Sequence, residues 1–465
     1  MSNPQRLQRA FARHGIALDY RDGIYRVHNE AAQATILLPA TLPLEEKAVH
    51  QLLDFAGVRS ADGHAGVCRA CATPDFHPGA IAPVGSVVAT PADFVIPSSI
   101  GTDINCGMRL LTTGLGLGQL APHKDALVKR LTRSLLDNGR DVPVSTRAFT
   151  ALFDDGPDAF LDRLDPLGLW AQCDRERLRA EVQRCVGLAS FAGHSRHVPA
   201  AYRSDAHAVF RDPSLGTPGA GNHFVELQVV DAVLDRHAAY DAGLRAGDVV
   251  VMIHSGSREL GFYVGQAWMD RAKLAWPAGV RHPRSGLYGL QGPLADDYLQ
   301  AMGAAARYAW ANRVVLAELV RKDLEAVAGA GGSRLVVDVP HNVVLREHGL
   351  NIHRKGATPA HAGDLALIPG SMGDASYLAT GLGHADWLWS CSHGAGRAVR
   401  RQQVRALKAA PAADQAWHCV TLREERRVEE APHAYKPIGP VIEAQEQAGL
   451  IQAAVRLRPW VTFKA

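Results

Sequence analysis

The chain has 465 residues, 47% of them apolar and 21% charged, and its 50 basic and 47 acidic side chains leave a net charge of +3. This composition excludes a mainly disordered protein and a uniformly basic surface, so any nucleic acid would have to bind to a local patch. There is no apolar run of about 18 residues and no apolar leader-like segment, and we therefore expect a cytoplasmic protein. Seven scattered cysteines are consistent with reduced thiols.

The predicted elements follow one another without a regular strand-helix-strand rhythm. Residues 1–57 contain short β-branched runs and a helix near 44–55, whereas residues 73–112 alternate apolar runs with Gly, Pro and Ser, as strands and tight loops do. Further helices are predicted over 119–137, 157–190, 262–275 and 295–329, after Ser392, and over about 441–456, with a short buried strand at 334–340. This order predicts an α+β fold.

Asp103 and Cys106 lie three residues apart in the segment GTDINCGMR, between Gly101 and Gly107. A tight turn here would aim a carboxylate and a thiol at one point, as two metal ligands require. The same residues fit an Asx turn followed by a buried cysteine. Taken alone, the pair leaves both interpretations open.

Three histidines occur where an apolar run meets a small or amide residue. His223 stands in GTPGAGNHFVELQ before a predicted strand, while His254 in VVVMIHSGSRELG and His341 in RLVVDVPHNVVLREHG end apolar strands. The glycine-rich segment before His223 lacks the lysine of a Walker loop. A histidine at a strand end is usually a hydrogen-bonded structural residue, but three in the same context favour a shared site.

The five candidates together are Asp103, Cys106, His223, His254 and His341. A thiolate, a carboxylate and three imidazoles exceed the need of one tetrahedral zinc ion. They suit one ion of higher coordination number or two ions that share the thiolate. This mixture of soft and hard donors disfavours Mg²⁺ and Ca²⁺ and leaves Mn, Zn, Co or Fe open.

His393 in SHGAGR is flanked by small residues, which leave room for a bulky group on the imidazole. The basic residues that follow have helical spacing and would form one stripe for phosphates: Arg397, Arg401, Arg405 and Lys408. An isolated basic stripe is more often a solvated helix face. Its position directly after a glycine-rich loop favours the binding of a polyanion.

Two weaker segments offer cations and backbone amides to phosphates. They are RKGAT, which contains Arg354 and Lys355, and PGSMG at 369–373. Cys68 and Cys71 form a single CxxC pair without a second pair to complete a zinc site, so we interpret them as structural.

Nine motifs in one order resemble the RtcB family of RNA ligases. They are PDFHPG, DINCGM, GAGNHFVELQ, HSGSRELG, HNVVLREHG, HRKGAT, PGSMGDASY, SHGAGR and EEAPHAYK, which run from residue 74 to 436. The resemblance implies a single catalytic domain over 1–465, with 1–60 weakly matched, in which mixed sheets surround a central dinuclear metal cleft. It also implies a ligase that uses GTP and two Mn²⁺ ions to join 2′,3′-cyclic phosphate or 3′-phosphate RNA ends to 5′-hydroxyl ends.

The resemblance assigns roles to matching positions. The five donors above would hold two manganese ions, with Cys106 bridging, and His393 would be the histidine that becomes guanylylated. The nucleotide would contact Asn222, Glu226, Ser371, Ser376, Gly394, Ala395, Gly396, Tyr435 and Lys464. Asp75 matches a further acidic residue near the metals, and the RNA phosphates are expected at Arg354, Lys355, Arg397 and Arg401.

Other functions fit parts of this pattern. A metal-dependent phosphodiesterase or phosphatase would use the same ions without a nucleophilic His393, and a nucleic-acid-binding protein would need only a structural metal. All five donors together with His393 favour the ligase over a structural site, which needs no open coordination position. A diverged paralogue that caps or repairs RNA or DNA 3′-phosphate ends is a further alternative. The expected partners are RNA and GTP, without a membrane, and we expect a monomer.

Overall fold

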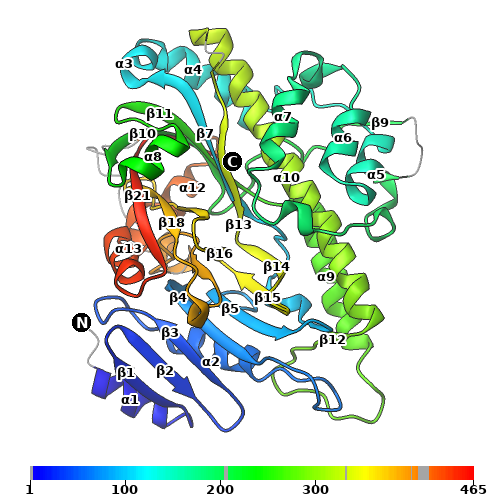
Figure 1. Cartoon of the computed structure of the whole chain (residues 1–465), viewed down its shortest axis with the longest axis vertical. Coiled ribbons are helices and arrows are strands. Elements are labelled where there is room, and N and C mark those ends of the chain that lie inside the picture. Colours follow the sequence, from blue (N-terminus) through cyan, green and yellow to red (C-terminus); the bar gives the residue numbers. More distant parts are fainter. Residues whose placement is uncertain (1–3, 204–207, 330–331, 400, 407–417) are drawn as a thin grey trace.

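The structure is a computed structural model that describes residues 4–203, 208–329, 332–399, 401–406 and 418–465 (Figure 1). Two large mixed sheets and several helices make up these residues, which confirms the predicted α+β class. None of the helices in the described ranges is both long and apolar enough to cross a membrane.

The first sheet has seven strands in the order β1-β2-β3-β4-β5-β15-β14. Their bounds are β1 Ala17–Arg21, β2 Ile24–His28, β3 Gln33–Leu37, β4 Arg69–His77, β5 Val84–Pro91, β14 Asn342–Glu347 and β15 Leu350–Lys355. Only the β3–β4 pair among these neighbours is parallel. The amino-terminal strands therefore extend the same sheet that carries the PDFHPG segment.

The second sheet follows the order β13-β7-β11-β10-β21-β18-β17, and β20 pairs with β21 in parallel. Its strands are β7 Gly107–Gly116, β10 Phe224–Val233, β11 Asp248–Ser255, β13 Leu335–Pro340, β17 Leu365–Ile368, β18 Ser376–Gly381, β20 Cys419–Thr421 and β21 Ile451–Lys464. The chain passes from this sheet to the first between β13 and β14, at His341. That crossing brings the two sheets together at the candidate metal residues.

Short strand pairs and helices complete the described fold. The pairs are β6 Phe94–Val95 with β12 Leu290–Gln291, β8 Val144–Ser145 with β9 Val209–Phe210, and β16 Ala357–Pro359 with β19 Ser390–Ser392. The helices are α1 Pro4–Ala12, α2 Glu46–Ala56, α3 Leu117–Leu120, α4 Lys124–Leu131, α5 Thr146–Asp154, α6 Pro157–Arg163, α7 Arg175–Val182, α8 Arg236–Ala242, α9 Arg258–Leu274, α10 Pro293–Ala328, α11 Arg401–Ala406, α12 Glu424–Glu429 and α13 Ile438–Gln447.

Helix α10 runs along most of the length of the molecule and packs against both β7 and β11 (Figure 1). All residues from 301 to 321 of this helix are buried, so it is enclosed on every side rather than amphipathic. Alanines allow close approach of its neighbours, and the buried charges that it also carries form the ion-pair network described below.

Most of the predicted elements are present. The helices expected near 44–55, 262–275 and 295–329 are α2, α9 and α10, and the strand expected at 334–340 is β13. The stretch 119–137 is helical but divided, because α4 passes into a wider π-type turn at Thr132–Leu136. Strands β4 to β7 confirm the interpretation of 73–112.

Three helix predictions are wrong in part. The stretch 157–190 contains two separate helices, α6 and α7, because Pro166 and Gly168 interrupt the pattern. Residues 451–456 belong to β21, whose pairing with β10 and β18 on both sides overrides local helix preference. After Ser392 the chain forms a loop, and α11 begins only at Arg401.

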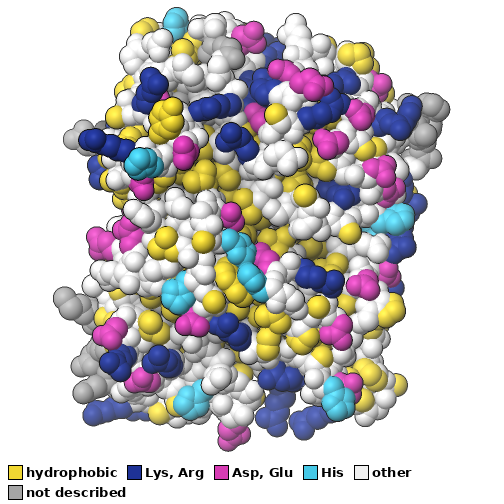
Figure 2. Space-filling model, viewed as in Figure 1, with side chains coloured by type: hydrophobic (Ala, Val, Ile, Leu, Met, Phe, Trp, Pro, Cys, Tyr) yellow, Lys and Arg dark blue, Asp and Glu magenta, His cyan; other side chains and the backbone are white. Residues whose placement is uncertain are grey.

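Acidic and basic side chains are interspersed on the face that Figure 2 shows, rather than gathered into one basic surface. This distribution agrees with the small net charge. Cys71 is buried in the core, whereas Cys68 is exposed and its thiol donates to the carbonyl of Ala89.

Candidate active site

Cys106, His223 and His254 meet at one edge of the second sheet. Cys106 directly precedes β7, His223 directly precedes β10, and His254 lies at the end of β11, which runs antiparallel between those two strands. The Cys106 Sγ atom lies 3.1 Å from Nε2 of His223 and 3.2 Å from Nε2 of His254. All three side chains are buried, and their ligand atoms lie within 4.8 Å of one another.

His341 and Asp103 extend this group, which we call the Cys106 cluster. Nε2 of His341 lies 3.1 Å from Nε2 of His254, and a carboxylate oxygen of Asp103 lies 2.9 Å from Nε2 of His223. The backbone N–H of His341 donates to the carbonyl of Cys106, which joins the sheet crossing to the β7 turn. The structure thus brings together all five predicted donors.

The turn before β7 depends on Asn105, whose φ of +52° lies in the left-handed region that Asn tolerates better than most residues. Its backbone N–H donates to the carbonyl of Asn342, and its side-chain amide donates to the carbonyl of Ala306. These bonds fix the backbone from which Cys106 projects.

The Cys106 cluster has the electrostatic character of a metal site. Burial holds the pKa values of His254 and His341 well below the usual range, so both imidazoles are neutral, as metal ligands must be. Burial and the Asp103 carboxylate raise the pKa of the Cys106 thiol, so a nearby cation is needed to stabilise the thiolate. Although burial opposes it, the charge and hydrogen bond of His223 lower the pKa of Asp103.

Hydrogen bonding alone does not satisfy these donors. Nδ1 of His254 faces the carbonyl of Asn222 at 3.2 Å, so the ring proton belongs there and the Nε2 lone pair points into the cluster. Nδ1 of His223 and Nδ1 of His341 are buried without a hydrogen-bond partner among the described residues. Imidazole lone pairs that converge on a thiol and a carboxylate fit a transition-metal ion.

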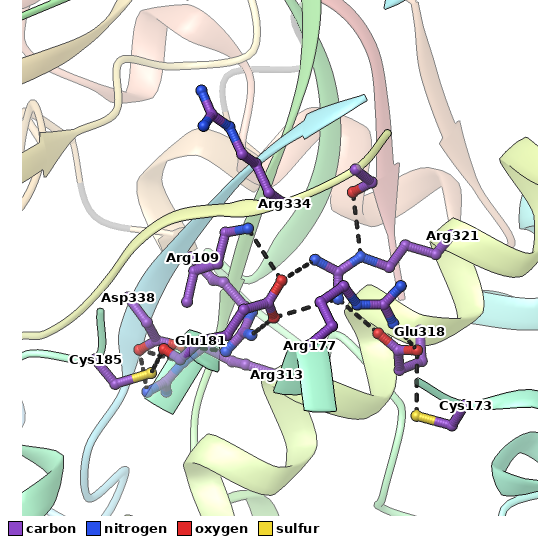
Figure 3. Close-up of polar contacts among 12 residues, drawn as sticks. Arg109, Cys173, Arg177, Glu181, Cys185, Arg313, Glu318, Arg321, Arg334 and Asp338 are labelled. Atoms are coloured by element: carbon purple, nitrogen blue, oxygen red, sulfur yellow. Dashed lines mark hydrogen bonds and ion pairs between the residues drawn. The ribbon is translucent and has the colours of Figure 1, made fainter. Parts of the chain in front are cut away.

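A buried ion-pair network supports the Cys106 cluster from α10 (Figure 3). Arg313 donates to the backbone carbonyls of Asn105 and Ser255 at 2.7 and 3.1 Å, which are the neighbours of Cys106 and His254. It also forms a bidentate pair with Asp338 of β13, whose carboxylate accepts from Arg109 as well. One guanidinium therefore joins three of the chain segments that carry the candidate ligands.

Figure 3 shows that this network continues through Glu181, which pairs with Arg109 and Arg321, to Glu318. Five of its six members come from α10 or from the adjacent strands β7 and β13, and the carboxylates and guanidiniums share partners. Each buried charge is thereby paired, as burial requires.

A cavity of about 680 Å³ opens beside the Cys106 cluster. The predicted residues on its wall are Asp103, Cys106, Asn222, Glu226, His254, His341, Lys355, Ser371, His393, Gly394, Ala395, Gly396, Arg397, Arg401, Tyr435 and Lys464. His223, Ser376, Asp75 and Arg354 are not on the wall. A space of this size accommodates a nucleotide.

His393 lies next to the Cys106 cluster, with its ring centroid 4.7 Å from that of His341. Nδ1 of His393 is 2.6 Å from a carboxylate oxygen of Asp75, which is fully buried behind it. Burial alone would raise the pKa of Asp75, but hydrogen bonds from His393 and Thr73 lower it overall, so the carboxylate is ionised. This pair leaves Nδ1–H on the Asp75 side and Nε2 free to act as a nucleophile.

Glycine is required where the His393 loop meets Asp75. Gly396 has a φ of +75°, and a Cβ there would lie 2.2 Å from the backbone oxygen of Asp75. Asp75, which was predicted near the metals, therefore pairs with His393 beside the Cys106 cluster.

Glu226 of β10 is a buried acidic group on the cavity wall. Its carboxylate accepts hydrogen bonds from Gln228 at 2.6 Å and from Thr462, and burial raises its pKa to about 7. Lys464 donates to the carbonyl of His223 at 3.1 Å. Ser376 lies behind this group, where its hydroxyl accepts from Gln228.

Three predicted residues converge on Glu430, which the sequence analysis did not single out. Arg397 and Arg401 pair with its two carboxylate oxygens at 3.1 and 2.9 Å, and the hydroxyl of Tyr435 also donates to it. The guanidinium of Arg397 additionally lies over the ring of Tyr435. This carboxylate holds both guanidiniums on the cavity wall.

The phosphate-binding predictions need correction. Arg354 is fully buried and pairs with Glu347 at 2.7 Å, so it has no access to the cavity, which contradicts its predicted role. Arg397 lies in the loop before α11, so it is not part of a helical stripe. The Arg405 side chain and Lys408 lie outside the described part of the chain. Lys355 does reach the wall.

Sequence reasoning also missed Arg313, Asn342 and Lys436. Asn342 accepts from the Gly356 backbone and donates to the Asp103 carbonyl, and Lys436 donates to the carbonyls of Pro74 and Phe76. Two of the motifs already quoted contain three of these overlooked residues: EEAPHAYK contains Glu430 and Lys436, and HNVVLREHG contains Asn342. Their position in these motifs could have identified them. Arg313 had no such signal, because it lies inside a long alanine-rich helix.

Comparison with known proteins agrees with this geometry. The family model described as tRNA-splicing ligase RtcB matches residues 57–465. A tRNA-splicing ligase RtcB of Pyrobaculum aerophilum is 34% identical over 430 residues, which cover 83% of this chain and 85% of that protein. An RNA-splicing ligase RtcB of Mycobacterium tuberculosis is also 34% identical over 430 residues, covering 85% and 96% of the two chains.

A similar relative from Archaeoglobus fulgidus, a tRNA-splicing ligase RtcB, is 31% identical over 469 residues and covers 90% of both chains. These matches extend over most of the chain, so they show membership of an enzyme family rather than a single shared motif. The chain belongs to the RtcB family of RNA ligases.

Proposed function

We propose that this enzyme is a GTP- and Mn²⁺-dependent RNA ligase that joins 2′,3′-cyclic phosphate or 3′-phosphate ends to 5′-hydroxyl ends. The observation that carries the proposal is the buried Asp75–His393 pair, which leaves one imidazole nitrogen free next to the Cys106 cluster. A phosphodiesterase that uses metal ions alone would have no need of this pair.

Asp103, Cys106, His223, His254 and His341 would hold two manganese ions in a dinuclear cleft, with the Cys106 thiolate shared. When bound, the ions would supply positive charge that polarises the reacting phosphoryl groups and offsets their negative charge. The five convergent donors, with the Nε2 atoms of the histidines directed at the thiol, the carboxylate and one another, support this assignment.

His393 would provide the nucleophile. Its Nε2 forms a bond to the α-phosphorus of GTP as the bond to pyrophosphate breaks, and Asp75 stabilises the positive charge that develops on the ring. The guanylyl group then passes from Nε2 to the RNA 3′-phosphate. The RNA 5′-hydroxyl attacks that activated phosphate, and GMP leaves.

Guanine would be recognised through Glu226. An ionised carboxylate accepts hydrogen bonds from the N–H groups of the guanine edge, which adenine does not present in the same pattern. Glu226 lies on the cavity wall together with Asn222, Ser371 and Lys464, and Ser376 supports it from behind through Gln228. Gly394, Ala395, Gly396 and Tyr435 form further parts of the wall.

Lys355, Arg397 and Arg401 would contact phosphates without reading bases. All three lie on the wall, and 42% of the Arg401 side chain is accessible, against 13% for Arg397, even though Glu430 pairs with both. The RNA end would therefore meet a small group of cations rather than a broad basic face.

Incubation with GTP labelled at the α-phosphate and Mn²⁺, followed by a denaturing gel, tests the proposal. We expect a labelled adduct in the unmodified protein and in His237→Ala, a control at an exposed histidine of α8. His393→Ala should keep its metal but form no adduct and join no ends. It should still seal RNA that already carries GMP on its 3′-phosphate.

A labelled adduct that persists in His393→Ala would contradict the assignment of the nucleophile. Hydrolysis of phosphate esters by unmodified protein that never forms an adduct would favour the phosphodiesterase instead.

A further inference from the structure

A second group of metal-ligating side chains lies on the surface, outside the cavity. It consists of His14, Glu46 and His50, whose ligand atoms all lie within 4.8 Å of one another. Nε2 of His14 is 3.2 Å and Nε2 of His50 is 3.6 Å from the same oxygen of Glu46. These residues precede the stretch matched by the family model, and the function proposed above gives them no role.

His14 is held by a turn whose neighbours are anchored in the core. Phe11 and Ile16 on either side of it are 2% exposed, and the backbone N–H of Ile16 donates to the carbonyl of Phe11. Gly15 has a φ of +71°, which lets the chain reverse direction directly after α1. The imidazole of His14 therefore projects outward from a fixed backbone.

Glu46 and His50 are four residues apart on α2, so their side chains lie on one face of that helix, one above the other. The opposite face is buried through Ala48, Leu52 and Phe55. The two imidazole planes, of His14 and His50, meet at 84° with centroids 5.9 Å apart, so they do not stack. Their Nε2 atoms instead approach the same carboxylate from two directions.

We propose that His14, Glu46 and His50 bind a divalent transition-metal ion of the zinc type. Two imidazole nitrogens and one carboxylate oxygen are a known ligand set for Zn²⁺, and water would complete the tetrahedron. Imidazole donors disfavour Mg²⁺ and Ca²⁺, which select oxygen ligands. The side chains are about half exposed, so an ion can enter from solvent and the backbone need not rearrange.

The bound ion would connect the end of α1 to α2 and so stabilise the amino-terminal part of the first sheet. Helix α2 also supports the cavity wall, because the amide of Gln51 donates to the carbonyls of Gly79 and Ile81 and accepts from the N–H of Gly79. The ion therefore adds to the stability of this region without touching the reacting groups.

Equilibrium dialysis of the full chain against zinc chloride, followed by elemental analysis, tests the proposal. The donors of the Cys106 cluster would also take up zinc in this experiment, so the informative quantity is the difference in zinc content between variants. We expect His14→Ala and His50→Ala to bind about one ion fewer per chain than the unmodified protein. His28→Ala, at an exposed histidine of β2, should bind the full amount.

Thermal unfolding gives an independent readout, because a ligand that binds only the folded state raises the melting temperature. Zinc should raise the melting temperature of His28→Ala by more than that of His50→Ala. Equal zinc content and equal zinc-dependent shifts in all three variants would overturn the proposal and leave a simple Glu–His ion pair. Either result is independent of RNA ligation, which the GMP-adduct assay reports separately.

Discussion

Replacing Arg313 by methionine should destabilise the protein and remove metal from the Cys106 cluster, although Arg313 touches none of the five donors. Its side chain is 2% exposed and pairs with Asp338. It also donates to the carbonyls of Asn105 and Ser255, next to two of the candidate ligands. Methionine has a similar length but no hydrogen-bond donor.

The size of the effect follows from these contacts. Removing one partner of a buried ion pair costs about 3–5 kcal/mol, and the lower value applies because Asp338 keeps its bond to Arg109. Each carbonyl that loses its donor adds about 1 kcal/mol, so the total is about 5 kcal/mol. That is similar to the whole stability of a weakly stable protein, which is about 5 kcal/mol.

Arg313→Lys separates positioning from stability. Lysine keeps the charge but cannot bind a carboxylate and two carbonyls at once. We therefore expect the free energy of unfolding to fall by only about 2 kcal/mol. The folded Lys variant should nevertheless bind Mn²⁺ more weakly than the unmodified protein, because the backbone beside Cys106 and His254 is less firmly held. Urea unfolding measures the first effect and metal titration measures the second.

Two results would refute this reasoning. A loss below 1 kcal/mol in Arg313→Met would show that the ion-pair network does not stabilise the sheet edge as argued. Unchanged Mn²⁺ affinity in a folded Arg313→Lys protein would show that Arg313 does not position the ligands.

Four further outcomes are expected. Asp75→Asn should slow formation of the GMP adduct by about 10²–10⁴-fold without changing metal content, as single-turnover kinetics and elemental analysis would show. Because burial raises the pKa of Glu226 to about 7 and guanine binds the ionised form, calorimetric GTP affinity should fall about tenfold per pH unit below 7, and a flat profile would contradict this. Cys106→Ala should lower the occupancy of both metal ions, whereas His341→Ala should mainly lower one, and full metal content in the first variant would exclude a shared thiolate. Arg401→Ala should weaken the binding of unrelated RNA sequences to the same extent. It should also reduce the slope of log affinity against log salt concentration by about one unit or less, whereas an unchanged slope would place Arg401 outside the RNA contacts.

The sequence predicted the members of the site better than their arrangement. Apolar runs that end in His254 and His341 indicate strands that stop at a functional edge, and the structure has both residues there. That β7 lies on the other side of β11 from β10 could not be predicted, because the pairing of β11 with β7 joins segments more than 100 residues apart. The motifs supplied this missing information only through the resemblance to a family.

The errors have a common physical origin in distant partners. Residues 451–456 have an alanine-containing pattern that suits a helix, yet two neighbouring strands draw them into β21. Arg354 and Arg397 look like free cations in the sequence, but Glu347 and Glu430 pair with them. Local composition cannot show such a partner, so a basic residue in a motif is a weaker sign of phosphate binding than a strand-end histidine is of a metal.

The same argument explains why His393 differs from the histidines beside it. Burial keeps His254 and His341 neutral, and Nδ1 of His254 faces a backbone carbonyl rather than a carboxylate. His393 has the ionised Asp75 behind Nδ1, contributed by a segment 318 residues away. That carboxylate fixes the tautomer and stabilises a cationic ring, which a nucleophile needs and a ligand does not. We therefore infer that the proposed division between nucleophile and ligand depends on the residue behind each imidazole, and Asp75→Asn tests that division directly.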